Sequence, residues 1–264
     1  MKKIVFVLTL TLLIITIWAE ETPNDTMNRL IDLFRQFHIT DIPEKISAND
    51  FNDKIINKIT KQDRKNFILS VYSKDPSGNY YILKNDLKDT DRKKIINTFH
   101  SIEYRVLTDK QKKENEKTSK EIEKIFDYKA LISGALQDHW DKMTKEQQND
   151  FYTSFKGLIE VVAYPQGSYF YSNSNNKFKK AVYEGDRAII SSENYNIDKD
   201  IDISISYIFK KNDNSWTLVD VEMNSHSLVD AYRLQINRVV SKKGISGLLS
   251  DLKNMYNQVK ARQK

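Results

Sequence analysis

The sequence predicts an α+β fold: a single curved antiparallel sheet with helices before and after it, preceded by an extra helical segment at the N-terminal end. Three observations point to this class. Apolar residues recur at helical spacing before Pro165 and after Ser227, whereas between them the period is two. Only seven glycines and four prolines occur in 264 residues, so long loops are not expected. The chain has no cysteine, and its core must therefore be held by packing alone.

The first 19 residues predict a secretory signal peptide. Lys2 and Lys3 are followed by a 15-residue apolar run from Ile4 to Trp18 and by the small residue Ala19. The run is shorter than the roughly 17–25 residues that cross a bilayer, although an uncleaved anchor is the alternative. No cysteine follows the run, so attachment of a lipid at this point is excluded. We expect export with cleavage after Ala19.

Residues 20–121 are expected to form a helical N-terminal extension. A first helix is predicted over residues 25–38 with Asn24 or Asp25 as its cap, because apolar residues recur there at helical spacing: Met27, Leu30, Ile31, Phe34 and Phe37. Two further helical regions, 49–72 and 88–104, are separated by DPSGNYYIL, which indicates a turn and a short strand.

A charged stretch separates this extension from the rest of the chain. Residues 108–124 contain almost no apolar side chain, which is typical of a solvated helix or a linker. The boundary between the two parts is therefore placed at residue 121.

Two segments of the chain resemble each other. ITKQDRKNF begins at Ile59 and MTKEQQNDF begins at Met143. Both place a threonine where a helix should begin, with Asp63 or Gln147 three positions later, which is the spacing of a capping box. Two helices that need the same cap would converge on this pattern, and duplication is the alternative.

Residues 122–264 are expected to form the main domain. Two amphipathic helices are predicted between residues 126 and 162, and two more after Ser227 with Gly244 between them. Five strands are predicted at 167–172, 179–185, 187–195, 202–211 and 215–223, with hairpin turns at 183–186 and 211–214. Within the strand 202–211, mostly polar residues alternate with an apolar set, so one face of the sheet should be dry: Ile203, Ile205, Tyr207 and Phe209.

Four residues near the end of the sheet are the side-chain types of a hydrolase triad: Asp220, His226, Ser227 and Asp230. A triad serine usually lies on a strained turn between glycines, near an oxyanion hole. Ser227 lacks that context and stands where a helix N-cap is expected, so we interpret it as structural. Paired carboxylates for glycoside chemistry stay open, because their pairing is spatial, but the sequence predicts no enzyme.

Metal and cofactor sites are not expected either. His38, His100, His139 and His226 are scattered without the spacing of metal ligands, and the chain has no glycine-rich phosphate loop. The formal charge is +6, but basic and acidic residues are interleaved, so nucleic acid is not an expected partner. A weak attraction to anionic membrane surfaces fits better. The chain also contains 14 Tyr, 12 Phe and 3 Trp, which could fill a core or surround an apolar cavity.

A series of motifs runs in order through residues 126–253. It begins with Phe126-Asp127, Trp140, TKEQ from Thr144, and an F-x-x-x-F-x-x-L pattern from Phe151. It continues with the strand ISYIF, then WTLVDV, SLV, YRLQI and GISGLLSDLK. In this order the motifs resemble those of the MlaC and toluene-tolerance family of periplasmic phospholipid carriers.

The resemblance implies a roll similar to that of nuclear transport factor two and a carrier that shuttles phospholipid between the two membranes of diderm bacteria. It further implies a periplasmic monomer that serves an inner-membrane ABC transporter complex and an outer-membrane lipoprotein and porin complex, and so maintains the lipid asymmetry of the outer membrane. Phospholipid would be the carried ligand, with no cofactor. Two departures stand out: Asn224-Ser225 replaces the Glu-Gly that usually precedes the V-S-L motif, and residues 27–111 exceed the family's short N-terminal helix.

We expect the lipid-lining residues to lie on the apolar faces of the predicted helices and strands: Trp140, Phe155, Leu158, Ile159, Val162, Ile189, Ile205, Tyr207, Phe209, Trp216, Leu218 and Tyr232. The alternative is an exported non-catalytic binding or interaction protein in which the same faces fill a packed interior. An enzyme on the same roll, with one buried acid as its base, is a third possibility.

Overall fold

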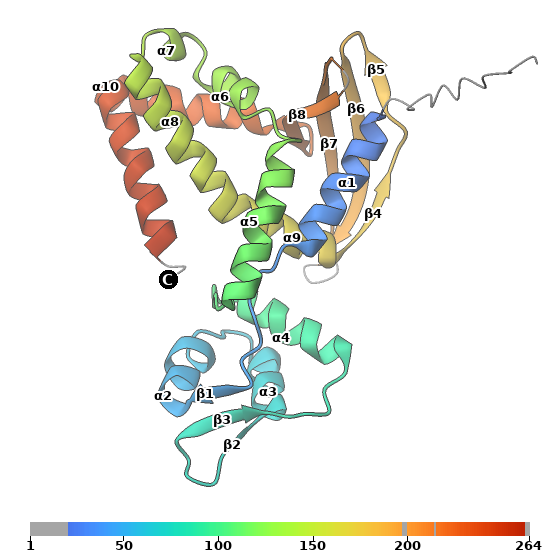
Figure 1. Ribbon diagram of the computed structural model, residues 1–264, viewed down its shortest axis with the longest axis vertical. Helices are drawn as coiled ribbons and strands as arrows, with labels where there is room; N and C mark the ends of the chain where they lie inside the picture. Colours follow the sequence, from blue (N-terminus) through green and yellow to red (C-terminus); the bar gives the residue numbers. More distant parts are fainter. Residues whose placement is uncertain (1–20, 197–199, 214, 262–264) are drawn as a thin grey trace, which may run out of the picture.

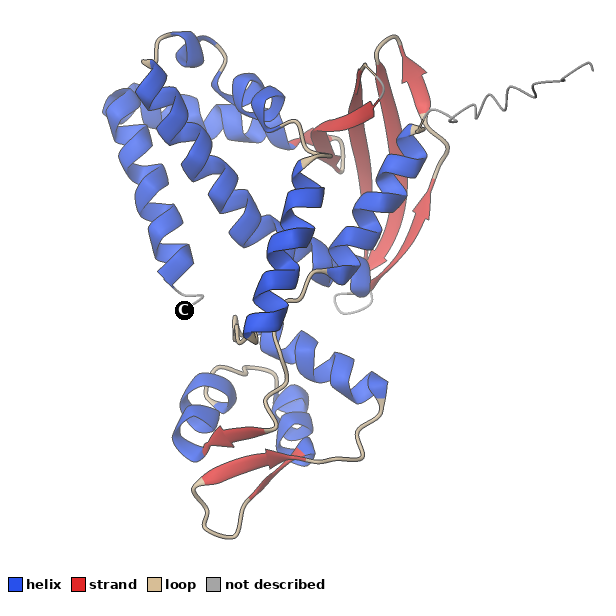
Figure 2. Ribbon diagram, in the orientation of Figure 1, coloured by secondary structure: helices blue, strands red, loops and turns tan. Residues whose placement is uncertain are grey.

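The computed structural model describes residues 21–196, 200–213 and 215–261. A six-stranded antiparallel sheet organises the larger part of the molecule, and a smaller unit is inserted between two of its helices (Figures 1 and 2). Within the described residues the sheet order is β4-β6-β7-β8-β9, with β5 also paired to β6. The strands are β4 (Ser174–Phe178), β5 (Val182–Glu184), β6 (Arg187–Asn196), β7 (Ile201–Asn212), β8 (Ser215–Met223) and β9 (His226–Ser227).

The long strands β6 to β8 follow the predicted alternation. Ile190 lies opposite Tyr207, and Ile205 lies opposite Met223, so the apolar residues of neighbouring strands share a face. Both predicted hairpins are confirmed, because Glu184 pairs with Arg187 and Asn212 pairs with Ser215. The register shifts between Ile208 and Phe209, and such a bulge bends a strand.

Two helices cover the apolar face of the sheet. Helix α1 (Pro23–Gln36) and helix α9 (Tyr164–Ser172) pack against each other and over the strands. Thr22 and Asp25 form a capping box at the start of α1, so the cap lies at Thr22 instead of the predicted Asn24 or Asp25. The resulting core joins residues of α1 and α9 to residues of the sheet: Met27, Leu30, Ile31, Phe34, Tyr164, Tyr171, Ala188, Ile190, Ile205, Tyr207, Phe209, Trp216 and Leu218.

A second layer of helices lies on the other side of α9 and β8 (Figure 1). It contains α6 (Tyr128–Leu136), α7 (Asp138–Asp141), α8 (Lys145–Leu158), the π-helix η2 (Ile159–Ala163) that continues α8, and α10 (Leu228–Ala261). Helix α10 packs against α6 and α8. It turns at Gly244, whose φ of 68° and ψ of −178° interrupt the helix, so α10 has two halves as the sequence predicts.

The inserted unit lies between α1 and α5 (Asp109–Glu123) and has its own sheet and core. Strands β1 (Lys45–Ser47), β3 (Tyr80–Leu83) and β2 (Tyr72–Lys74) pair in that order. They are covered by α2 (Ala48–Asp50), the π-helix η1 (Phe51–Ile56), α3 (Gln62–Val71) and α4 (Asp89–Ser101). Phe51, Ile68 and Phe99 are fully buried in this second core.

Helix α4 attaches the inserted unit to the larger part. Asn97 and Asn173 exchange side-chain hydrogen bonds of 2.6 and 3.1 Å. The His100 ring stacks on Tyr169 with 4.3 Å between ring centroids. These contacts join α4 to α9, which itself covers the sheet.

Several sequence predictions are wrong. Residues 167–172 were expected as a strand but form part of α9, because Tyr164, Ser168 and Tyr171 bury one helical face. The strand lies instead at residues 174–178.

The N-terminal extension also departs from the expectation. The turn and short strand predicted within 75–83 are confirmed by β3, but β1 and β2 were not expected, and the expected helix over 49–72 is broken between η1 and α3. Of the two predicted capping boxes, that of Thr144 and Gln147 is confirmed. The one at Thr60 is wrong, because α3 begins after Lys61 without a side-chain cap. The signal peptide lies outside the described residues, and the boundary at residue 121 stays a prediction.

Candidate functional site

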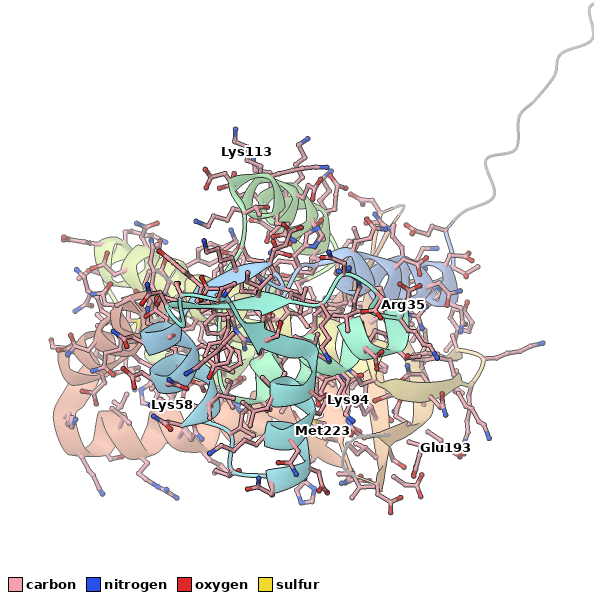
Figure 3. All side chains as sticks on the ribbon, turned by 90° about the horizontal axis from the view of Figure 1, so that it is seen from below. Arg35, Lys58, Lys94, Lys113, Glu193 and Met223 are labelled. Carbon is pink, nitrogen blue, oxygen red and sulfur yellow. The ribbon has the colours of Figure 1, made fainter. Side chains whose placement is uncertain are left out.

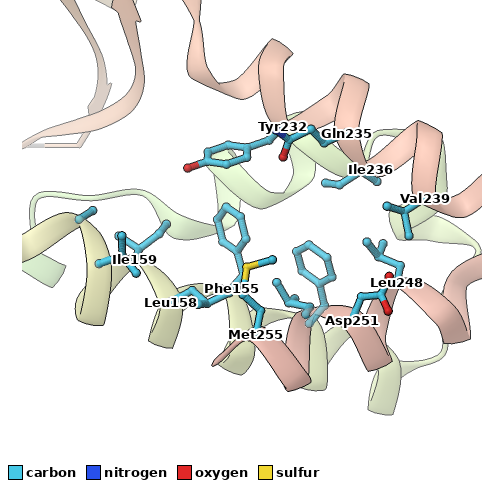
Figure 4. A pocket seen from close by; sticks show the side chains of 14 residues that line it. Phe155, Leu158, Ile159, Tyr232, Gln235, Ile236, Val239, Leu248, Asp251 and Met255 are labelled. Carbon is cyan, nitrogen blue, oxygen red and sulfur yellow. The ribbon is translucent and has the colours of Figure 1, made fainter. Parts of the chain in front are cut away.

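An apolar cavity of about 340 Å³ lies between α8, η2 and the two halves of α10 (Figure 4). Its wall is made almost wholly of aliphatic and aromatic side chains: Phe151, Phe155, Leu158, Ile159, Val162, Ala163, Tyr232, Gln235, Ile236, Val239, Leu248, Asp251, Leu252 and Met255. A volume near the lower end of the roughly 300–1,000 Å³ typical of small-molecule sites makes it a candidate binding site.

The helices that form the wall follow from the sequence. Phe151, Phe155 and Leu158 recur at intervals of four and three, so they lie on one face of α8. That face continues onto η2, where Ile159 and Val162 follow. A π-turn rotates the side-chain positions relative to an α-helix and is common at functional sites.

Two glycines set the shape of the cavity. Gly244 has a φ and ψ that only glycine adopts readily, and the turn there brings the second half of α10 back beside α8. Gly157 of α8 lies against the Tyr256 ring, and a Cβ at this position would approach a ring carbon to 2.6 Å. A larger residue at position 157 would therefore have to displace the Tyr256 ring of α10.

A smaller cavity of about 90 Å³ adjoins the first. The two share Phe155, Ile159, Ala163 and Tyr232, and the smaller one extends to Leu218 and Val221 of β8. Between them the rings of Phe155 and Tyr232 meet edge to face, with 5.5 Å between centroids and an interplanar angle of 83°. This aromatic pair therefore contributes to the walls of both cavities.

Polar groups in the larger cavity are few. Asp251 is held by Lys243, whose Nζ lies 2.7 Å from Oδ2. Burial raises the pKa of the Tyr232 phenol, which therefore stays neutral. The wall offers little to compensate a charged ligand group, so the cavity suits an apolar one.

Five of the predicted lipid-lining residues line the larger cavity: Phe155, Leu158, Ile159, Val162 and Tyr232. Leu218 lines the smaller one. Trp140 packs against the cluster of α6, α8 and α10 without lining either cavity. Apart from Tyr232, the sequence reasoning missed the residues that α10 contributes, although the apolar stripe that continues with Ile236 and Val239 was visible at helical spacing.

Four of the five remaining predicted residues lie under the sheet. Ile205, Tyr207, Phe209 and Trp216 are buried in the core below α1, and the Tyr207 hydroxyl lies 2.6 Å from that of Tyr171. Ile189 of β6 is partly buried opposite Val182 of β5. The structure thus fills the dry face of β7 with α1 and α9, and the role of these residues in lipid binding stays a prediction.

The residues that resemble a triad do not form one. Ser227 Oγ donates to Asp220 Oδ2 at 2.5 Å and accepts from the backbone N–H of Asp230 at 3.0 Å, which is the geometry of a helix cap. His226 instead directs Nδ1 toward the carbonyl of Asn224 at 2.9 Å. Asn224 and Ser225 both have positive φ, so the turn is left-handed here without a glycine.

The described part of the chain shows neither a cluster of metal ligands nor a membrane-spanning helix. In the described ranges, no three histidine, aspartate or glutamate side chains come together as ligands for a metal ion. No helix within residues 21–261, as far as the structure describes them, combines the length and apolar character needed to cross a bilayer.

Some residues of the motif series have clear structural roles. Asp127 caps α6 by accepting from the N–H of Ala130 at 2.9 Å, and its own backbone N–H donates to the carbonyl of Leu218 at 3.0 Å. Arg233 of α10 donates to the carbonyl of Gly134 at 3.1 Å. These contacts join α6 to β8 and to α10, so the motifs hold together the elements around the two cavities.

Comparison with known proteins identifies the family. No curated protein matches the chain. Among solved structures, a phospholipid-binding protein from Ralstonia solanacearum in complex with a phospholipid is similar, with 21% sequence identity and a TM-score of 0.48 over 56% of this chain and 83% of that one. The family model for the MlaC protein matches residues 92–254, which is more than half of the chain. The chain therefore belongs to the MlaC family.

Proposed function

We propose that the protein is a periplasmic phospholipid carrier. It holds an acyl chain of the lipid in the cavity between α8, η2 and α10. The observation that carries the proposal is this cavity, with an almost wholly apolar wall, in a chain of the MlaC family. An acyl chain is the apolar ligand that suits such a wall, because no buried charge has to be compensated.

The physical mechanism is sequestration without covalent chemistry. Each methylene removed from water contributes about 0.8 kcal/mol, so a sixteen-carbon chain gains roughly 12 kcal/mol. Spontaneous release into water is then slow, whereas transfer into a membrane is nearly neutral in free energy. The carrier would therefore exchange lipid only when docked, and family membership favours an inner-membrane ABC transporter complex and an outer-membrane lipoprotein and porin complex as its docking partners.

Native mass spectrometry of the purified protein tests the proposal. We expect the wild-type protein to carry an adduct with the mass of a phospholipid. Val162→Glu places a carboxylate at the cavity mouth, where the side chain is 44% exposed, and should abolish the adduct while the protein stays folded. Val182→Glu is the matched control, because Val182 is 60% exposed on β5, away from the cavity.

One observation favours a second candidate, an exported binding protein with a packed interior. The dry face of β7 is packed against α1 and α9, and its residues Ile205, Tyr207 and Phe209 line neither of the two apolar cavities. A wild-type protein that is free of lipid after mild purification from a diderm host, and that extracts none from vesicles, would favour this candidate over the carrier.

A further inference from the structure

A separate cavity of about 280 Å³, lined by both apolar and charged side chains, lies where the inserted unit joins the larger part. It is bounded by the two connecting segments, by α5 and by η2. Glu160 and Val161 of η2 line it, whereas Ile159 and Val162 line the apolar cavity, so the two sites lie on different faces of the same π-helix.

Hydrogen bonds fix the frame of this cavity. The Asn115 side chain accepts from the backbone N–H of His38 at 2.7 Å and donates to the His38 carbonyl at 2.8 Å. Thr40 Oγ1 accepts from the N–H of Val106 at 3.2 Å and joins the two connecting segments. Ser168 donates to the carbonyl of Phe37 at 2.7 Å. The walls are therefore held in place before any ligand binds.

Arg105 lines the cavity, and the Glu103 carboxylate compensates its positive charge only in part. Its Nη1 atom is buried and has no hydrogen-bond partner among the described residues. Burial lowers the pKa of the guanidinium, with an opposing effect from the Glu103 carboxylate, but arginine stays protonated in proteins. A buried charged donor without a partner is costly, and native structures rarely leave one unmatched.

Apart from the Glu103 carboxylate, the neighbouring titratable groups offer little that could offset the charge of Arg105. His100 is 6% exposed, and its Nδ1 atom is likewise buried without a partner in the described chain. Burial, followed by the charge of Arg105, lowers the pKa of His100 to about 4, so this ring is neutral at neutral pH. Of the two carboxylates that line the cavity, Glu160 is held by Lys156 at 3.2 Å and Glu116 is exposed on α5.

We propose that this cavity binds a phosphate group, with the Arg105 guanidinium as its principal ligand and Lys112 at its mouth. A guanidinium presents several N–H donors in one plane and binds phosphate oxygens through paired, charge-assisted hydrogen bonds. Lys112 lines the same cavity, and its ion pair with Asp109 is long, at 3.7 Å, and exposed. The phosphate could belong to a lipid head group or to a free phosphate, because both present the same oxygens.

Titration calorimetry on the full chain in phosphate-free buffer tests the site. We expect saturable binding of inorganic phosphate, weakened by at least about tenfold in Arg105→Gln, the loss that corresponds to one charge-assisted hydrogen bond. Lys113→Gln is the matched control, because Lys113 also carries one positive charge but projects away from the body on α5 (Figure 3). It should bind phosphate as the wild type does.

A second binding experiment distinguishes a lipid head group from free phosphate as the ligand. A short-chain phosphatidylglycerol below its micelle concentration should bind more tightly than inorganic phosphate, and depend on Arg105, if the site takes a lipid head group. Equal or weaker binding assigns the site to free phosphate. Arg105→Lys keeps the positive charge and provides a second test in case Arg105→Gln does not fold. It should bind phosphate with an affinity between those of the wild type and Arg105→Gln. A wild-type protein that binds neither probe, or a folded Arg105→Gln that binds both unchanged, would overturn the proposal.

Discussion

Ser227 Oγ donates a hydrogen bond to Asp220 Oδ2 at 2.5 Å across the turn that connects β8 to α10. The other carboxylate oxygen, Oδ1, accepts from the backbone N–H groups of Val221 at 2.8 Å and Val229 at 3.2 Å. Asp220 therefore holds the end of the strand and the start of the helix together. Asp220 and Ser227 therefore cap the start of α10 and do not form a triad with His226, whose ring contacts the backbone carbonyl of Asn224.

Replacing Ser227 by alanine should lower the free energy of unfolding by about 1 kcal/mol, the usual cost of a lost N-cap. The Asp230 N–H would lose its acceptor, and Asp220 would lose a donor. Urea unfolding followed by circular dichroism measures the change. The exposed His226→Ala is the control and should leave both stability and lipid content unchanged; a folded His226→Ala protein that has lost lipid transfer would point to a catalytic role.

A charge under the sheet should unfold the protein, whereas a charge in the apolar cavity should not. Ile205 is 6% exposed in the core below α1, so Ile205→Glu costs several kcal/mol of desolvation. That cost is comparable to the whole stability of a domain, about 5–15 kcal/mol. Circular dichroism of Ile205→Glu and Val162→Glu should show an unfolded and a folded chain respectively. A folded Ile205→Glu protein would indicate that the space below β7 can open.

Replacing Gly244 by alanine should cost about 1–3 kcal/mol, because its φ of 68° and ψ of −178° lie in a region that is nearly restricted to glycine. If the strain is relieved by straightening α10, the second half of the helix leaves α8 and the cavity opens to solvent. Urea unfolding and the lipid adduct in native mass spectra report on the two effects. Ser241→Ala, in the regular part of the same helix, is the control and should change neither.

Acid should destabilise the protein through His100. The pKa of its ring is about 4 in the folded chain and 6.5 in the unfolded chain, because of burial and the charge of Arg105. Between pH 6.5 and pH 4 the His100 ring is protonated in the unfolded chain but mostly neutral in the folded chain. The contribution of the neutral, buried ring to the free energy of unfolding is therefore fully present above pH 6.5 and is lost as the pH falls toward 4. Allowing for solvent screening, the loss is about 1–2 kcal/mol.

Unfolding free energies at pH 7.5 and pH 5 measure this effect. His100→Gln removes the titrating group and should flatten the dependence on pH, whereas His226→Gln, which replaces an exposed ring, should retain it. An identical slope for the wild type and His100→Gln would show that other groups cause the acid sensitivity.

The protein recovered from its native host should begin at Glu20. The basic start, the 15-residue apolar run and the small residue Ala19 are the signals for cleavage. N-terminal sequencing of the periplasmic fraction gives the answer directly. An intact Met1 on a membrane-bound protein would instead support the uncleaved anchor.

The local structure of the sheet and of most helices was determined by the sequence alone. The alternation of Ile203, Ile205, Tyr207 and Phe209 is sufficient to predict β7, since side chains in a strand point to opposite faces in turn. The capping box of Thr144 and Gln147 marks the start of α8 from local chemistry alone, and Gly244 marks the break in α10. Residues 167–172 show where local reasoning fails: their apparent alternation is overridden because Tyr164, Ser168 and Tyr171 bury one helical face.

Only the tertiary structure decided what covers each apolar face. The dry face of β7 is compatible with a cavity or with a packed core, and it is α1, far away in the chain, that fills it. The stripes of α8 and α10 are equally apolar, yet a cavity of about 340 Å³ separates them, because the turn at Gly244 and the contact of Gly157 with Tyr256 set the positions of the helices. The role of Arg105 could not be predicted from the sequence. Its burial depends on two connecting segments and two helices that come together only in the folded chain. The periodicity of apolar residues indicates which side chains are buried. Which side chains they pack against depends on contacts between segments that are distant in the chain.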